Sequence, residues 1–302
     1  MRMFLPASFG SFLALASLCL GMPLFAESAP GRALPAEVVL ALKPDKDPDK
    51  MLAERESLAK ALGTSLGRPV KVIVPLSTAV IIEGLSNGSI DLGYLSATDM
   101  VNARDAEAAS LLLVGEIDGK RSYESVWLCL KDSAHKQIAD LQGKPVAFAS
   151  RTSTSGYLVP LLDLKKQNLI EKNPTEFFGE GNVWFGTGYM SAVERVLAGE
   201  AEAAAVSDYV YDKDKHLTPE QKSRLRILAK QGPVPTHVIA VASSLTPEAS
   251  AQLREALLDF SEKNPALRDT IFTSRLVETD AKIHLQPAED ALAFAKGAQS
   301  AQ

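Results

Sequence analysis

The chain has 302 residues, of which 46% are hydrophobic and 23% are charged. This composition is typical of a globular protein, and the length suggests about two domains. The formal net charge of −5 argues against a broad basic face for nucleic acid and against a polybasic patch for a membrane surface.

Residues 1–26 have the pattern of an export signal. Arg2 gives the segment a short positive start, and residues 4–26 carry no charge before Glu27. We expect cleavage near Ala26, which would place the mature protein in the periplasm. A retained membrane anchor is the alternative, because about 20 apolar residues can cross a bilayer. The prolines, glycines and serines of the segment favour cleavage.

The mature sequence offers no ligand set for a metal or a cofactor. One of the two cysteines lies in the export signal, which leaves Cys129 alone. A single cysteine excludes an internal disulfide and a cysteine-based zinc site. The four histidines are scattered without metal-ligand spacing. We therefore expect neither metal nor cofactor, and we expect the Cys129 thiol to be buried.

Strands alternate with helices in the first part of the mature chain. A glycine, Gly88, stops the second of these helices before an acidic residue leads into the next strand. Such alternation predicts βαβ units and a largely parallel sheet. The predicted elements are a strand at 37–42, a helix at 51–66, a strand at 70–74, a helix at 78–87 and a strand at 90–95.

The same pattern returns later, again with a glycine, Gly199, at the end of a helix. These elements are a strand at 146–149, a helix at 157–168, a strand at 183–185, a helix at 191–198 and a strand at 201–206. Two copies of one plan predict two α/β lobes. Apolar runs at 125–130 and 238–242 are the candidate crossings between them, and a helix at 246–263 returns to the first lobe. Lobe I then comprises 36–125 plus 237–302, and lobe II comprises 126–236.

A run of hydroxyl residues follows the predicted strand at 146–149. It reads Thr152-Ser153-Thr154-Ser155 and is followed by Gly156, where the next helix begins. A helix start presents free amides and the positive end of the helix dipole, so it favours anions. Glycine allows a ligand to approach the backbone closely. The run predicts an oxyanion site.

A well-capped helix with spare serines is the alternative interpretation of this run. Two catalytic motifs are excluded at this position. No Gly-Lys-Ser/Thr follows, so the segment is not a Walker A loop, and the GxSxG pattern of a nucleophile elbow is absent.

Several stretches resemble the periplasmic phosphate, phosphite and phosphonate-binding proteins of ABC transporters. TSTSGYLVP at 152–160 is similar to the signature of that family. Three further stretches match it in order and spacing: TAVIIEGLSNGSIDLGYLSAT at 78–98, SYESVWL at 122–128 and AEAAAVSDYV at 201–210. The resemblance implies a two-lobed Venus-flytrap fold of type II, with two crossing strands as the hinge and the ligand in the cleft.

The resemblance also implies roles for individual residues. Ser153, Thr154 and Ser155 would hold the oxyanion together with the helix amides and Gly156. Tyr123 would donate its phenol from the crossing strand. Asp208 would face a substituent of the ligand, such as an amine.

The sequence departs from the family at two of its ligand positions. Thr78 stands where phosphonate binders often carry tyrosine, and Tyr189 stands where they carry histidine. The oxyanion contacts are therefore retained, whereas the part that recognises the rest of the ligand has changed. Phosphite, phosphate, methylphosphonate and other tetrahedral oxyanions all stay open as the ligand.

Other candidates depend on their position in the predicted elements. Ser96 follows the strand at 90–95, and ligands bind at the carboxyl ends of parallel strands. Tyr94 is predicted to pack in the core, whereas Arg151 lies beside the hydroxyl run and could pair with an anion. The two tryptophans, Trp127 and Trp184, are predicted core residues.

We expect a binding protein and not an enzyme. It would capture a small oxyanion and deliver it to a membrane permease, acting as a monomer. The first alternative is a sensor of the same fold that signals to a membrane histidine kinase. Its ligand would be an oxyanion such as arsenite, arsenate or selenite. A hydrolase with Ser153 or Ser155 as nucleophile is the second, but no histidine lies near the other site segments in the sequence.

Overall fold

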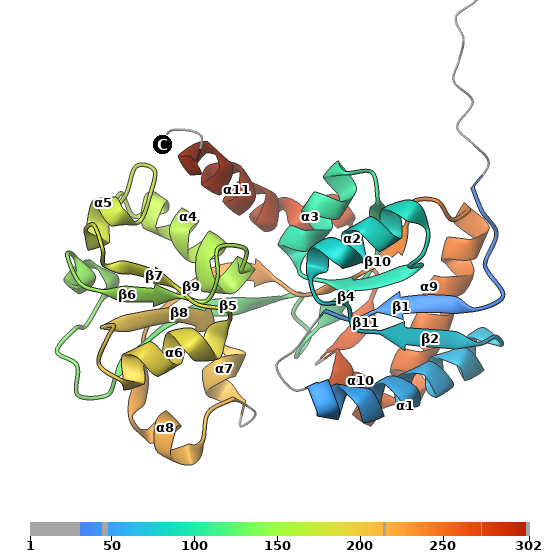
Figure 1. Ribbon diagram of the computed structural model, residues 1–302, viewed down its shortest axis with the longest axis horizontal. Helices are drawn as coiled ribbons and strands as arrows, with labels where there is room; N and C mark the ends of the chain where they lie inside the picture. Colours follow the sequence, from blue (N-terminus) through green and yellow to red (C-terminus); the bar gives the residue numbers. More distant parts are fainter. Residues whose placement is uncertain (1–30, 44–47, 214–215, 273, 300–302) are drawn as a thin grey trace, which may run out of the picture. The chain divides into compact units, whose positions relative to one another are not determined.

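The computed structural model describes residues 31–43, 48–213, 216–272 and 274–299. Within these ranges the chain forms two β-sheets, each flanked by helices (Figure 1). The predicted α/β class is thereby confirmed. The predicted export signal lies outside the described residues. Every helix in the described ranges is too short or too polar to span a bilayer.

The first sheet has six strands in the order β11-β4-β10-β3-β1-β2. β1 pairs in parallel with β2 and β3, whereas β10 lies antiparallel between β3 and β4. β1, β2 and β3 correspond to the three strands predicted in the first part of the chain. The strands are β1 Val38–Ala41, β2 Val70–Ile73, β3 Leu92–Leu95, β4 Ala109–Glu116, β10 Val238–Ala242 and β11 Arg275–Val277.

Helices cover both faces of this sheet and bury a continuous apolar core. Gly88 ends α2 in the left-handed conformation, with φ of 77°, as its place after the predicted helix suggests. Thr246 begins α9 by accepting a hydrogen bond from the Ala249 amide. The helices are α1 Pro48–Leu66, α2 Thr78–Asn87, α3 Ala97–Asp105, α9 Pro247–Lys263 and α10 Pro265–Ile271.

The second sheet has five strands in the order β7-β6-β8-β5-β9. β6 pairs in parallel with β7 and β8, and β5 lies antiparallel between β8 and β9. Trp127 on β5 is fully buried, and its indole donates to Gln231 at 2.8 Å. The strands are β5 Ser122–Leu130, β6 Val146–Phe148, β7 Val183–Phe185, β8 Ala203–Ser207 and β9 Leu225–Pro235.

The helices of the second lobe lie on both faces of its sheet, where two apolar clusters are buried. Cys129 lies in one of these clusters and is a free, buried thiol, as predicted. The helices are η1 Ile138–Leu141, η2 Thr154–Leu158, α4 Val159–Lys166, α5 Thr175–Phe178, α6 Tyr189–Leu197, α7 Tyr209–Asp212 and α8 Pro219–Ser223.

The chain passes between the sheets in two short connections, 117–121 and 236–237. The predicted crossings at 125–130 and 238–242 are wrong, because each of these runs lies within one sheet. β5 pairs with β8 and β9, and β10 pairs with β3 and β4. The Thr236 hydroxyl donates to the Gly115 carbonyl at 2.6 Å and so ties the second connection to β4, just before the first.

The last helix, α11 (Ala281–Gln299), contributes to the cores of both lobes. Leu285 and Ala288 pack in the first core, whereas Ala291 and Ala295 pack in the second. Figure 1 shows α11 beside α3, and it also contacts α4. The C-terminal helix therefore links the lobes in addition to the two connections.

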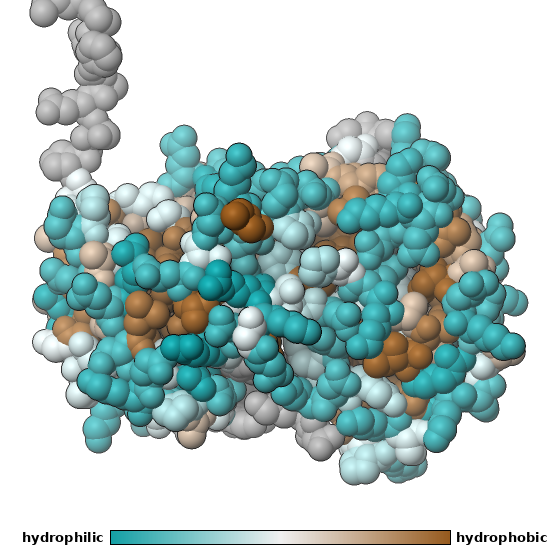
Figure 2. Space-filling model, turned by 180° about the vertical axis from the view of Figure 1, so that it is seen from behind, coloured by the Kyte–Doolittle hydropathy of each residue, from teal (hydrophilic) through white to brown (hydrophobic). Residues whose placement is uncertain are grey.

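Polar side chains dominate the face drawn in Figure 2, and apolar side chains show there as separate patches. Among the described residues, the large apolar side chains that stand out as exposed are Leu76, Val80 and Ile283. Single exposed apolar residues are normal for a soluble protein.

Candidate functional site

The predicted hydroxyl run forms the start of a helix in the second lobe. A π-helical turn, η2, leads directly into α4. Ser153 is the N-cap, and its Oγ accepts from the Gly156 amide at 3.0 Å. One serine thus serves the cap, and the next two hydroxyls, Thr154 and Ser155, are free for other contacts. Single π-turns within helices occur frequently at functional sites.

Ser155 lies at the centre of a group of hydroxyls. Its side chain is fully buried, and its Oγ lies 2.7 Å from the Tyr189 phenol oxygen. The Tyr123 phenol donates to the same Oγ at 3.4 Å. Ser125 on β5 fixes the backbone at this point, because its hydroxyl donates to the Ser155 carbonyl at 2.7 Å. Three predicted site residues therefore meet at one oxygen atom.

Thr154 points to the first lobe. Its Oγ1 lies 2.7 Å from the Oγ1 of Thr98 on α3, and both side chains are buried. These residues are 56 positions apart in the sequence. The helix start that sequence reasoning selected is thus an inward-facing element of the second lobe that contacts the first. Sequence reasoning did not select Thr98.

Thr98 belongs to a chain of polar groups at the start of α3. Ser96 is the N-cap of this helix, and its Oγ lies 3.2 Å from Thr98 Oγ1. The Ser96 hydroxyl donates to Asp99 Oδ2 at 2.5 Å, and the Lys43 ammonium lies 3.3 Å from the same oxygen. We refer to Ser96, Thr98, Tyr123, Thr154, Ser155 and Tyr189 together as the hydroxyl cluster.

Gly156 is required by packing at the helix start. A Cβ atom at this position would lie 2.4 Å from the Cβ of Ala149 and 2.8 Å from Ser153 Oγ. The Cβ of Ala149 is held by the backbone and cannot move aside cheaply. Only glycine therefore allows the helix start to pack in this position, beside the Tyr189 ring.

The Tyr123 phenol is a neutral donor to the cluster. Burial raises the pKa of Tyr123 well above its ordinary value, and the neighbouring Tyr189 and Asp208 act in the same direction. Tyr189 packs edge-on against Tyr209, with ring centroids 5.7 Å apart. Neutral hydroxyls can hold an anion by dense hydrogen bonding without a basic surface.

The carboxylate of Asp208 is engaged by backbone amides. One oxygen accepts from the Tyr209 amide at 2.8 Å, and the other accepts from the Glu124 amide at 3.0 Å. Asp208 thereby caps the short helix α7 and ties it to β5. A ligand amine is not needed to satisfy its charge.

Tyr94 on β3 and His237, which lies just before β10, form an aromatic pair in the first lobe. Their rings stack with centroids 5.2 Å apart, and the Tyr94 hydroxyl donates to the Phe272 carbonyl at 3.1 Å. Burial lowers the pKa of His237 to about 4, and the Lys43 charge adds to this effect. His237 is therefore a neutral ring at physiological pH. The spacing of the histidines along the chain did not indicate that His237 contacts Tyr94, which lies in the predicted site segment at 78–98.

The remaining candidates lie outside the hydroxyl cluster. Thr78 is the first residue of α2, and no hydrogen bond among the described residues joins it to the cluster. The Arg151 guanidinium lies 4.0 Å above the Phe185 ring, and that of Arg195 lies 4.2 Å above the ring of Trp184. The arginine beside the hydroxyl run is thus stacked on an aromatic ring in this structure.

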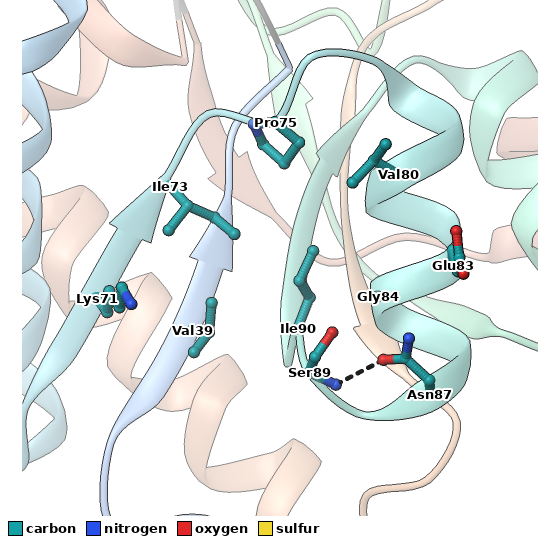
Figure 3. A pocket seen from close by; sticks show the side chains of 10 residues that line it. All are labelled: Val39, Lys71, Ile73, Pro75, Val80, Glu83, Gly84, Asn87, Ser89 and Ile90. Atoms are coloured by element: carbon teal, nitrogen blue, oxygen red, sulfur yellow. Dashed lines mark hydrogen bonds between the residues drawn. The ribbon is translucent and has the colours of Figure 1, made fainter.

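A groove of about 310 Å³ on the first lobe differs in character from the cluster. Figure 3 shows it between α2 and the strands β1 and β2, with Lys71 and Glu83 at its margins. Most of its other lining is aliphatic, with Ile73, Val80 and Ile90 among the residues that contribute. Because no set of buried hydroxyls converges there, we assign the site to the hydroxyl cluster.

Comparison with known proteins shows the family of the chain. The family model described as the periplasmic substrate-binding protein of phosphonate ABC transporters matches residues 40–283. The phosphate-import protein PhnD of Mycolicibacterium smegmatis is 26% identical over an alignment of 250 residues, which covers 80% of this chain and 76% of that protein.

Many solved structures have a similar fold. The Xanthomonas citri protein XAC2383, bound to chloride, matches with a TM-score of 0.74 at 20% identity, over 87% of this chain and 100% of its own. PhnD1 of Prochlorococcus marinus, in complex with methylphosphonate, matches with a TM-score of 0.71 at 19% identity, over 87% and 99% of the two chains. These matches confirm the predicted two-lobed binding-protein fold. The chain belongs to the family of periplasmic substrate-binding proteins of phosphonate ABC transporters.

Proposed function

We propose that this protein captures a small tetrahedral oxyanion of the phosphate, phosphite or phosphonate type and delivers it to a membrane permease. The observation that carries the proposal is the convergence of buried hydroxyls on Ser155 at a helix start. Buried polar groups in such number are costly unless they are paired. Here the Ser155 Oγ faces two phenols, and the N-cap role belongs to Ser153 alone.

The ligand is held mainly by neutral donors. The hydroxyls of Thr154, Ser155, Tyr123 and Tyr189 and the first amides of the helix supply the hydrogen bonds, and the helix dipole favours negative charge. Ser153 and Gly156 shape this helix start, and Ser96 supports it from the first lobe. We propose that Thr78, the first residue of α2 on the first lobe, contacts the ligand as well.

The chain favours a small ligand over one with a cationic substituent. Both carboxylate oxygens of Asp208 already accept hydrogen bonds from amides. Tyr189, which stands in place of the family's histidine, uses its hydroxyl on Ser155. We infer that phosphate, phosphite and methylphosphonate bind more tightly than an aminoalkylphosphonate.

A thermal-shift screen followed by titration calorimetry tests the proposal. The purified protein is tested with phosphate, phosphite, methylphosphonate, 2-aminoethylphosphonate, sulfate, selenite, arsenate and arsenite. A bound ligand stabilises the folded protein and so raises the temperature of the unfolding midpoint. At a ligand concentration of 100 times the Kd, the added stability is about 3 kcal/mol. We expect a shift with at least one phosphorus oxyanion and the same ligand recovered unchanged afterwards. No shift with any of these anions would refute the proposal.

We further propose that the protein acts as a monomer. Only scattered large apolar side chains stand out as exposed among the described residues, and stable interfaces need larger apolar patches. Sedimentation analysis with and without the bound oxyanion is expected to give one species of monomer mass. A ligand-dependent dimer would contradict this part of the proposal.

A further inference from the structure

The direction of the hydrogen bonds between the lobes follows from counting protons. A hydroxyl has one proton to donate and can accept two hydrogen bonds. Asp99 pairs with the Lys43 ammonium at 3.3 Å, and an ionised carboxylate only accepts. The Ser96 hydroxyl lies 2.5 Å from Asp99 Oδ2, so its single proton is committed to that oxygen.

The remaining protons are then fixed in turn. Ser96 Oγ must accept from Thr98, whose Oγ1 lies 3.2 Å away. Thr98 has then used its own proton, so it accepts from Thr154 at 2.7 Å. All of the donations therefore run one way, from Thr154 through Thr98 and Ser96 to Asp99. Burial of the three hydroxyls keeps water from supplying another partner.

This series of hydrogen bonds makes the first lobe a hydrogen-bond acceptor at the site. When a ligand oxygen accepts the hydrogen bond that Thr154 donates, Thr98 loses this donor. Thr98 still donates to Ser96, so one of its lone pairs is free to accept a hydrogen bond. An incoming oxyanion meets donors on the second lobe, in Thr154 and Ser155, and an acceptor on the first. A ligand oxygen that carries a proton can donate a hydrogen bond to Thr98. An anionic oxygen without a proton can only accept, so it and the Thr98 oxygen would repel each other.

We propose that the chain of Asp99, Ser96 and Thr98 makes Thr98 a hydrogen-bond acceptor and so selects tetrahedral oxyanions that carry a proton. Hydrogen phosphate has such a proton at neutral pH, and sulfate has none. This inference deepens the proposed function and rests on it. A site built to pair with a ligand hydroxyl discriminates strongly against an analogue that lacks it, because a buried polar group is then left unpaired.

Calorimetric titration with phosphate and sulfate tests the inference. We expect the wild-type protein to bind phosphate at least about 10-fold more tightly than sulfate. In Asp99→Asn, the side-chain amide can donate to Ser96. Ser96 can then donate to Thr98, and Thr98 can donate to the ligand, so that every hydrogen bond in this series changes direction. The ratio of the two affinities should then fall by about 10-fold or more.

A matched variant controls for the loss of one negative charge. Asp105→Asn removes the same charge from the same helix, α3, where Asp105 is exposed and pairs with Arg104 at 2.8 Å. It should leave the ratio unchanged. Thr98→Val offers a second test of the site, because it keeps the shape of the side chain while it removes the acceptor. We expect it to lower the affinity for phosphate more than that for sulfate.

A pH series on the wild-type protein needs no variant. Phosphonates lose their second proton near neutral pH, as phosphate esters do, whereas phosphate keeps one proton. The affinity for methylphosphonate should therefore fall relative to that for phosphate as the pH rises through this range. A constant ratio across the series would overturn the inference.

The outcomes separate this inference from the proposed function. Equal binding of phosphate and sulfate by the wild-type protein, or an unchanged ratio in both Asp99→Asn and Thr98→Val, overturns the inference and leaves oxyanion capture intact. Binding of none of the anions overturns both.

Discussion

Replacement of Ser155 by alanine tests the centre of the proposed site. The change removes the Oγ that contacts Tyr189 at 2.7 Å and Tyr123 at 3.4 Å, in a side chain with no exposed surface. Loss of one such hydrogen bond should lower the free energy of unfolding by about 1 kcal/mol.

The expected effect on binding is larger than the effect on stability. A hydrogen bond to a charged partner is worth about 1.5–3 kcal/mol, which corresponds to about 10- to 100-fold in Kd. In the variant, the two phenols lose their partner and can turn to the ligand. We therefore expect an affinity loss near the lower end of this range, about 10-fold in Kd, for every phosphorus oxyanion that the wild-type protein binds.

Titration calorimetry measures this loss of affinity in Ser155→Ala and in a control variant in which another buried serine is replaced. Ser261 on α9 is equally buried, and its Oγ accepts from the Leu276 amide at 3.0 Å. Ser261→Ala should lower stability by a similar amount and leave the affinity unchanged. If Ser155→Ala binds all of the anions within about twofold of the wild-type affinity, Ser155 does not contact the ligand.

Three further predictions concern packing, specificity and pH. Gly156→Ala should lower the free energy of unfolding by about 1–3 kcal/mol, because its Cβ would lie 2.4 Å from that of Ala149, and chemical denaturation measures this loss. Gly297→Ala, where a Cβ meets no atom within 4 Å, should cost far less. Tyr189→His should shift the calorimetric ranking toward phosphonates, and an unchanged ranking would show that Tyr189 does not line the site. The pKa of His237 is about 4 in the folded chain and about 6.5 in the unfolded chain, so the unfolded chain binds more protons between these values and stability should fall as the pH drops from about 6.5 to about 4. Thermal unfolding of the wild-type protein and of His237→Gln measures this, and equal slopes in the two proteins would assign the pH dependence to other groups.

Local patterns in the sequence were sufficient to predict much of the fold. Alternating apolar runs and helical spacing predicted β1, β2, β3, β6, β7 and β8 close to their observed bounds. The hydroxyl run before Gly156 predicted the helix start, because the N-cap, the glycine and the following apolar residues lie next to one another along the chain. Such features depend on neighbouring residues, and the sequence states these directly.

The lobe crossings could not be read from local patterns. An apolar run such as 238–242 is equally compatible with a strand buried in one sheet and with a strand that passes between two sheets. β10 is such a strand, and only its pairing with β3 and β4 places it wholly in the first lobe. The helix α11 shows the same limit, because its two ends pack in different cores.

The sequence by itself determined which segment of the second lobe begins with a run of hydroxyl residues, and that the family's histidine is replaced by Tyr189. Only the tertiary structure decided what these hydroxyls face. Thr98 and Thr154 lie 56 positions apart and are joined at 2.7 Å, and Lys43 reaches Asp99 from the end of another strand. Hydrogen bonds act over about 3 Å, so the partners of a buried group depend on how distant segments pack and not on the spacing between them along the chain.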